Sequence, residues 1–248
     1  MRIIDTAAFV GSWPFRPLPD SGPEALKARL QRAGIAHALV SPVETVLQRS
    51  PQTANRVWAA RLADDPFFSF VPVADPAQAG AVQVLDQAEA PAVRLLPGPH
   101  GYGLDQARDL ATEAGRRDVA VILQWRMIDV RMAHPDVVHR ELTAPEVRSL
   151  AEACPDTRFL VAGARQPEVA AVLADGPANL WCELSTVESP NVVRRLIEAY
   201  GIDRLLCGTH APIHVPEALA AKLAAADLSE GEQEVLGHRT AEELFRLA

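Results

Sequence analysis

The chain has 248 residues, close to the roughly 250 of a single closed βα barrel, and 48% of them are hydrophobic. Its formal net charge of −8 argues against a nucleic-acid partner, because that kind of binding needs a concentrated basic face. The opening MRIIDTAAF is too polar and too short for a secretory signal, and no window approaches the roughly 18 consecutive apolar residues of a membrane span, so we expect a cytoplasmic protein without a membrane partner.

Short apolar runs alternate along the chain with amphipathic stretches that are bounded by Pro, Gly and Ser. Because each run is continuously apolar rather than alternating, it predicts a strand that is buried on both faces, as in parallel sheets. Eight runs of this kind occur, in chain order Ile3–Asp5, His37–Ser41, Phe67–Val73, Val93–Leu96, Val119–Gln124, Arg158–Ala162, Leu180–Leu184 and Arg204–Cys207.

A helix is predicted after every run, at about 23–33, 52–64, 78–89, 104–116, 144–154, 167–174, 190–200 and 216–226. Several of these helices carry proline at the first helical position, where a missing N–H costs nothing and φ is already set. A last segment opens with Ser229 and Glu232, which have the spacing of a capping box.

Eight βα units in a chain of this length predict one (β/α)₈ TIM barrel, forming a single domain over residues 1–248. A doubly wound open sheet is the alternative, but no GxGxxG or GxxxxGK sequence follows any of the strands. The three cysteines show no CxxC spacing, so neither a disulfide framework nor a zinc knuckle is indicated.

The working face of such a barrel is the carboxyl end of its strands, so the polar residues just after each run are the candidate site residues. Arg94 lies inside an apolar run and needs a partner there, either Asp5, Glu183 or a bound carboxylate. The expected catalytic residues are His210, Asp5 and His100. The expected substrate-binding residues are Arg94, Arg126, Tyr102, Gln124 and Trp13.

Three stretches of the chain resemble the amidohydrolase-2 branch of the metal-dependent hydrolases. The opening RIIDTAAFVG is similar to that family's first strand, GIDRLLCGTHAP to its last barrel strand, and LSEGEQEVLGHRTAEELF to its closing helices. The resemblance covers nearly the whole chain and implies the same barrel. The branch includes decarboxylases and lactonases of small aromatic or unsaturated acids.

The chain departs from that family at the positions that carry its metal ligands. Where the resemblance places histidines or an aspartate, this sequence has Ala7, Phe9, Gln124, Gly163 and His210. A divalent ion needs about three to four converging donors, and alanine, phenylalanine and glycine have no donor in their side chains. We therefore expect the usual metal site to be missing.

Three functions follow as hypotheses. The first is an enzyme that acts on a small carboxylate without the metal, by hydrolysis of a lactone or amide or by decarboxylation. Arg94 and Arg126 would hold the anion, and His210 would be general base or acid, assisted by Asp5, His100 or Tyr102.

The second hypothesis is a non-catalytic relative that keeps the fold for binding. The third is a rebuilt zinc site formed by His100, His134 and His210 with an acid such as Asp129 or Asp5. A homo-oligomer is also possible for barrels of this kind, but no part of the sequence identifies an interface.

Overall fold

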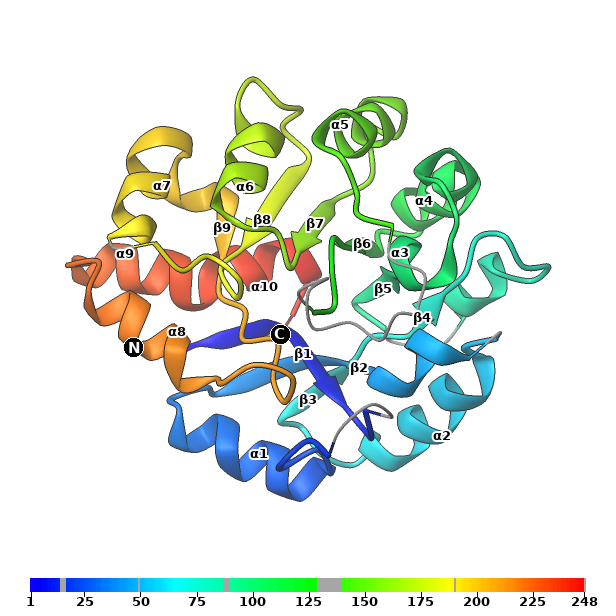
Figure 1. The fold of residues 1–248 in the computed structure, drawn as a ribbon, viewed down its shortest axis with the longest axis horizontal. Helices are drawn as coiled ribbons and strands as arrows, with labels where there is room; N and C mark the ends of the chain where they lie inside the picture. The colour runs from blue at the N-terminus through cyan, green and yellow to red at the C-terminus, as the bar shows by residue number, and fades with distance from the viewer. Residues whose placement is uncertain (14–16, 49, 87–89, 129–139, 190, 248) are drawn as a thin grey trace.

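In the computed structural model, parallel strands form the centre of the molecule and helices lie outside them (Figure 1). The structure describes all residues except 14–16, 49, 87–89, 129–139, 190 and 248. The strands are β1 (Ile4–Val10), β2 (His37–Pro42), β3 (Phe68–Phe70), β4 (Val73–Ala74), β5 (Ala92–Leu95), β6 (Ala120–Gln124), β7 (Phe159–Ala162), β8 (Leu180–Glu183) and β9 (Leu205–Leu206).

The strands form two parallel sheets, one with the order β1-β2-β3 and one that contains β4 through β9 in sequence order. β3 and β4 are two parts of the run predicted over Phe67–Val73, so each of the eight predicted runs contributes to the sheet. The first strand also meets the end of the last one, because the Thr6 amide donates at 3.0 Å to the carbonyl of Cys207, the residue directly after β9. This pattern is the (β/α)₈ barrel that the sequence predicts.

The helices lie at positions close to the predicted ones. They are α1 (Pro23–Arg32), α2 (Gln52–Leu62), α3 (Pro97–His100), α4 (Arg108–Arg116), α5 (Ala144–Ala153), α6 (Gln166–Leu173), α7 (Val192–Tyr200), α8 (Glu217–Ala224), α9 (Glu230–Glu234) and α10 (Thr240–Phe245), and the short 3-10 helices include η1 (Val43–Leu47), η2 (Val82–Asp86) and η3 (Leu104–Ala107).

One helix prediction is wrong. The helix expected over 78–89 is only the short 3-10 helix η2 within the described part of that range. Gly80 has a φ of +84°, which a right-handed helix cannot accommodate, so the helical pattern is interrupted there. The short helix α3, by contrast, was not predicted.

Within the described residues, no helix has the length and apolarity needed to cross a bilayer.

The two ends of the barrel are closed by different groups of apolar side chains. At the amino end, Leu244 and Phe245 of α10 pack against strand residues such as Ile4 and Leu39. At the carboxyl end lies a separate apolar cluster, which we call the mouth cluster. It consists of Phe9, Trp13, Val43, Val46, Val73, Leu96, Met127 and Ile213.

Candidate functional site

Polar side chains converge beneath the mouth cluster, at the carboxyl end of the strands. They come from β1, β2, β5, β6 and β8 and from the segments that follow β8 and β9, and all of them are buried. This placement is where barrel enzymes carry their chemistry. We call these residues the central polar cluster: Asp5, Ser41, Arg94, Gln124, Glu183, Ser185, Thr209 and His210.

Arg94 provides the positive charge of the central polar cluster. Its Nε donates to Ser41 Oγ at 2.9 Å and its Nη1 donates to Gln124 Oε1 at 2.6 Å, while Nη2 has no hydrogen-bond partner among the described residues. The guanidinium carbon lies 4.4 Å from the centre of the Phe9 ring. Burial lowers the pKa of Arg94 to about 10, so the side chain stays charged at neutral pH.

The expected partner of Arg94 is Asp5, Glu183 or a bound carboxylate, and neither of the two acidic residues is hydrogen-bonded to it. These carboxylates counter its charge through space, since both act to raise the pKa of Arg94 against the effect of burial. Their hydrogen bonds go elsewhere. Glu183 accepts from the Gly163 amide at 2.6 Å and from the Ser185 amide and hydroxyl at 2.5 and 2.7 Å.

Asp5 lies at the first strand with its carboxylate fully buried. It accepts hydrogen bonds from the amides of Ala7 and Thr209 and from the Thr209 hydroxyl. Burial raises the pKa of Asp5 to about 6, although these hydrogen bonds oppose the rise and Glu183 adds to it. Asp5 can therefore change its protonation state close to physiological pH.

His210 contacts two neighbouring rings and is hydrogen-bonded through both of its nitrogens. Nε2 is 3.3 Å from Gln124 Nε2, and Nδ1 is 3.4 Å from Ser185 Oγ. The ring centres of Phe9 and His214 are each 5.1 Å away, and the His214 ring is stacked at an interplanar angle of 28°. Burial, with the charges of His214 and Arg94, holds the pKa of His210 well below 6.5.

Arg126 lies at 7% exposure beside this cluster. Its Nε and Nη2 donate to Glu141, its Nη1 and Nη2 donate to Glu168, and Nη1 also donates to the Gly163 carbonyl. All five N–H bonds of the guanidinium are thus donated within the protein. This geometry does not support the expected direct contact between Arg126 and a substrate anion, because the guanidinium already faces the carboxylates of Glu141 and Glu168.

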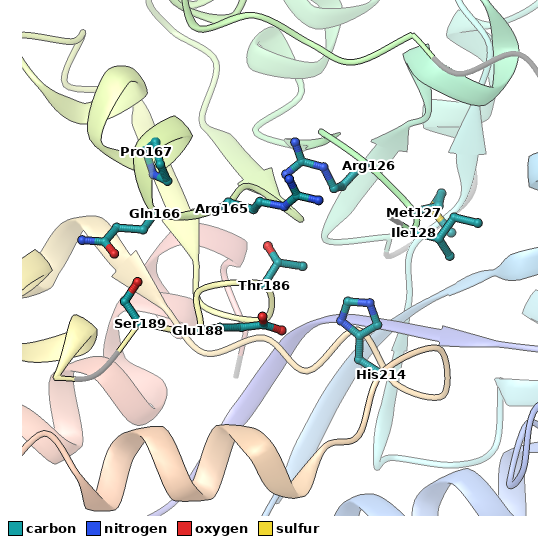
Figure 2. Close-up of a pocket in the computed structure, with 10 residues that line it drawn as sticks. All are labelled: Arg126, Met127, Ile128, Arg165, Gln166, Pro167, Thr186, Glu188, Ser189 and His214. Carbon is teal, nitrogen blue, oxygen red and sulfur yellow. The ribbon is translucent and has the colours of Figure 1, made fainter. Parts of the chain in front are cut away.

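A cleft of about 330 Å³ opens beside the central polar cluster, over the ends of β6, β7 and β8. Figure 2 shows Arg126 and Arg165 on one side of the cleft and His214 on the other. Its remaining lining residues are Met127, Ile128, Gln166, Pro167, Thr186, Glu188 and Ser189.

Sequence reasoning did not assign His214 or Arg165 a role. The chain turns back at His210, where φ is +59° and the carbonyl accepts from the amides of Ile213 and His214. This turn brings the second histidine of GTHAPIH to the cleft and buries the first. Positive φ at a histidine is uncommon, and the sequence offers no signal that predicts it here.

Three other expected site residues lie outside the central polar cluster. His100 Nε2 donates to the Thr45 carbonyl at 2.8 Å and joins α3 to η1. Tyr102, 6.2 Å from His100 between ring centres, is buried, and burial raises the pKa of its hydroxyl well above 10. Trp13 is part of the mouth cluster. Functional roles for these residues stay predictions.

The residues present do not fit a divalent cation of the kind that the family resemblance implies. Phe9, Gln124, Gly163 and His210 do converge: a Cβ on Gly163 would lie 2.8 Å from Gln124 Nε2 and 3.2 Å from His210 Cε1. Only His210 among them is a usual ligand, and both of its nitrogens are already engaged.

The described part of the chain contains no group of three His, Cys, Asp or Glu residues that could hold a metal ion. The alternative zinc site included His134, with Asp129 as a possible acid. Both of these lie outside the described residues. That alternative stays untested.

Comparison with known proteins places this chain in a family. The amidohydrolase family model matches residues 8–247. The search of curated proteins gave no significant match.

Among solved structures, 5-carboxyvanillate decarboxylase from Sphingomonas paucimobilis superposes with a TM-score of 0.76 at 15% identity, covering 100% of this chain and 99% of the other. A 2,6-dihydroxybenzoate decarboxylase from Rhizobium gives 0.72 at 15% identity, with 98% of each chain covered. A putative 2-pyrone-4,6-dicarboxylic acid hydrolase from Pseudomonas putida gives 0.69 at 19%, covering 98% and 97%. At such low identity these similarities show only that the fold is shared. The family model covers nearly the whole sequence and therefore shows the family. The chain therefore belongs to the amidohydrolase family.

Proposed function

We propose that this protein is a hydrolase or decarboxylase that acts on a small carboxylate in the cleft over β6–β8, without the divalent metal of its metal-dependent relatives. The observation that carries the proposal is the pair of stacked imidazoles. His214 lines the cleft, and His210 lies behind it in the buried central polar cluster. The similar folds of two carboxylate decarboxylases and a putative dicarboxylic acid hydrolase support the substrate class.

In this proposal His214 transfers the proton and Arg165 contacts the substrate carboxylate. In hydrolysis, His214 would take a proton from the water that attacks a lactone or amide carbonyl. In decarboxylation, it would give a proton to the carbon that loses CO₂. Arg165 is an exposed cation that lines the cleft, and an arginine guanidinium can bind a carboxylate through two parallel hydrogen bonds.

Supporting roles without substrate contact are proposed for three buried residues, Arg94, Gln124 and Asp5. The buried charge of Arg94 disfavours a proton on His210, and Gln124 joins the two side chains. We propose supporting roles for them rather than direct contact with substrate, because each is fully buried beneath the mouth cluster.

The test is turnover of a panel of lactones, amides and aromatic carboxylates by wild type, His214→Asn, His210→Ala and Arg165→Met. We expect His214→Asn to abolish turnover of any substrate found. Arg165→Met should raise KM more than it lowers kcat. Equal rates for His214→Asn and wild type would reject the proposed role of the cleft. Elemental analysis of protein purified without chelators should accompany the assay, and stoichiometric metal would contradict the metal-free mechanism.

A second candidate is a binding protein without catalysis. The mouth cluster favours it, because Phe9, Trp13 and their neighbours fill the end of the barrel that is open to substrate in a typical barrel enzyme. Carboxylate binding in the cleft without turnover of any panel member would favour this candidate. We also propose that the chain is a single cytoplasmic domain that can self-associate and binds no nucleic acid.

A further inference from the structure

A continuous line of hydrogen bonds joins the buried cation Arg94 to the buried anion Glu183. It runs from Arg94 Nη1 to Gln124 Oε1 at 2.6 Å, and from Gln124 Nε2 to His210 Nε2 at 3.3 Å. It continues from His210 Nδ1 to Ser185 Oγ at 3.4 Å and from Ser185 Oγ to Glu183 Oε1 at 2.7 Å. No member of this line is more than 7% exposed.

The two ends of the line fix the direction of every bond in it. A guanidinium can only donate, so the oxygen of the Gln124 amide faces Arg94 and its NH₂ group faces His210. Because an amide NH₂ can only donate, His210 Nε2 must be the acceptor. At the other end a carboxylate accepts, so the Ser185 hydroxyl donates to Glu183 and its oxygen is left to accept from His210 Nδ1–H.

We infer that this line of hydrogen bonds locks His210 as a neutral imidazole with its proton on Nδ1, so that His210 is a positioning residue and His214 is the imidazole that exchanges protons with a ligand. A proton on Nε2 would face the NH₂ group of Gln124. Rotating that amide would relieve this contact, but would turn the same NH₂ group toward Arg94.

The surroundings of His210 favour the same state. The ring is fully buried and contacts the rings of Phe9 and His214. Among the described residues, the charged and titratable groups around it include Arg94 and His214, which disfavour an imidazolium, and Glu183, whose oxygens are taken by Ser185 and Gly163. Asp5 is nearby on β1, where its carboxylate accepts from the amide and hydroxyl of Thr209. The lone pair of His210 Nε2 is also unavailable to a metal ion while Gln124 donates to it.

The test is a long-range ¹H–¹⁵N NMR spectrum of protein labelled at the imidazole nitrogens, recorded from pH 5 to pH 8. His210→Asn identifies the His210 signals, and asparagine tolerates the left-handed backbone at this position. We expect a protonated Nδ1 and an unprotonated Nε2 in the wild type, unchanged over the whole range. A His210 that carries its proton on Nε2, or that titrates between pH 6 and pH 7, would overturn the inference.

Two variants sharpen this test. Gln124→Glu replaces the NH₂ group, which also donates to the Arg126 carbonyl at 2.8 Å, with an accepting oxygen. We expect a proton to appear on His210 Nε2. Ser41→Ala is the matched control, because it removes one hydrogen bond of Arg94 and leaves the line to Glu183 intact. Its His210 signals should equal those of wild type. If Gln124→Glu does not fold, the wild-type spectrum alone still decides the protonation state.

The role of His214 in this inference rests on the proposed function, whereas the state of His210 does not. The NMR measurement uses no substrate, so a protein without turnover leaves it intact. If a substrate is found, His210→Asn should shift the pH profile of kcat, and His214→Asn should abolish turnover. Turnover that survives in His214→Asn but is lost in His210→Asn would overturn the division of roles.

Discussion

The guanidinium of Arg94 lies 4.4 Å from the centre of the Phe9 ring, so a cationic side chain covers a residue that the sequence resemblance aligns with a metal ligand of the metal-dependent hydrolases. Phe9 has no donor for a metal, but the face of its ring attracts a cation. The centre of this barrel therefore carries a positive charge that belongs to the protein chain.

Replacing Arg94 with methionine should destabilise the fold strongly. The change leaves Asp5 and Glu183 buried without their compensating charge, and it breaks the bonds to Ser41 and Gln124. Removing one partner from a buried charge arrangement costs about 3–5 kcal/mol. Urea denaturation measures the loss. Arg56→Met on the exposed side of α2 is the control and should change the free energy of unfolding by less than about 0.5 kcal/mol. Similar losses for the two variants would contradict a central role for the Arg94 charge.

Asp5 should make stability depend on pH in a defined window. Its pKa is 3.8 as a free side chain and about 6 in the fold, so the folded state binds the proton more tightly. The folded protein should therefore lose stability as pH rises from about 4 to about 6. This amounts to about 3 kcal/mol, at about 1.4 kcal/mol for each unit between the two pKa values.

The measurement is the difference between wild type and Asp5→Asn in free energy of unfolding, followed over the same range of pH. The asparagine keeps an oxygen for the amides of Ala7 and Thr209, and its NH₂ can donate to the Thr209 hydroxyl. We expect the stability of the variant relative to wild type to increase as pH rises through this window. A difference that does not change with pH would show that burial does not perturb Asp5.

Gly163 should not tolerate any side chain. Its φ is +75°, and a Cβ would lie 2.6 Å from the Arg126 carbonyl and 2.8 Å from Gln124 Nε2. We expect Gly163→Ala to cost at least about 2 kcal/mol, from backbone strain together with overpacking. Gly101→Ala is a matched control, since Gly101 has a φ of +72° and no described residue lies within 4 Å of its added Cβ. It should cost only about 1 kcal/mol, from the left-handed backbone alone. Equal melting temperatures for the two variants would argue against the crowding at Gly163.

The barrel could be predicted from sequence because continuous apolar runs buried on both faces recur eight times with helices between them. The prediction failed at 78–89, where Gly80 ends a pattern that otherwise suits a helix. Arg94 could be identified as a site residue because a guanidinium inside an apolar run must have a special environment. Its partners could not be identified, since Ser41 and Gln124 lie 53 and 30 positions away in the chain.

The cleft could not be predicted for a related reason. Arg126 is a conspicuous cation after β6, but its charge is countered by Glu141 and Glu168, which lie 15 and 42 positions further along. Which histidine of GTHAPIH reaches the cleft depends on the turn at His210. Both outcomes depend on tertiary contacts that a local pattern does not encode.

The countered charge of Arg126 leads to a last prediction. Arg126 lines the cleft, and with Glu141 and Glu168 it forms a group of net charge −1. Such a group repels an anionic ligand. Glu141→Gln should remove that excess charge, and the glutamine oxygen can still accept from Arg126. Because Glu141 is 39% exposed, solvent screens the effect. We expect affinity for a probe such as benzoate to rise about two- to fivefold at low salt.

Isothermal titration at low and high salt measures this change, and the gain should shrink as salt rises. The control for the general loss of one negative charge is Glu152→Gln, at an exposed glutamate on α5.

If Arg126 itself binds the carboxylate directly, Arg126→Lys should abolish binding. If its five donors are already taken by the protein, the lysine should still balance part of the two carboxylate charges. Binding should then weaken by less than about tenfold, and Arg165→Met should have the larger effect. Loss of binding in Arg126→Lys but not in Arg165→Met would reverse the assignment of the anion contact.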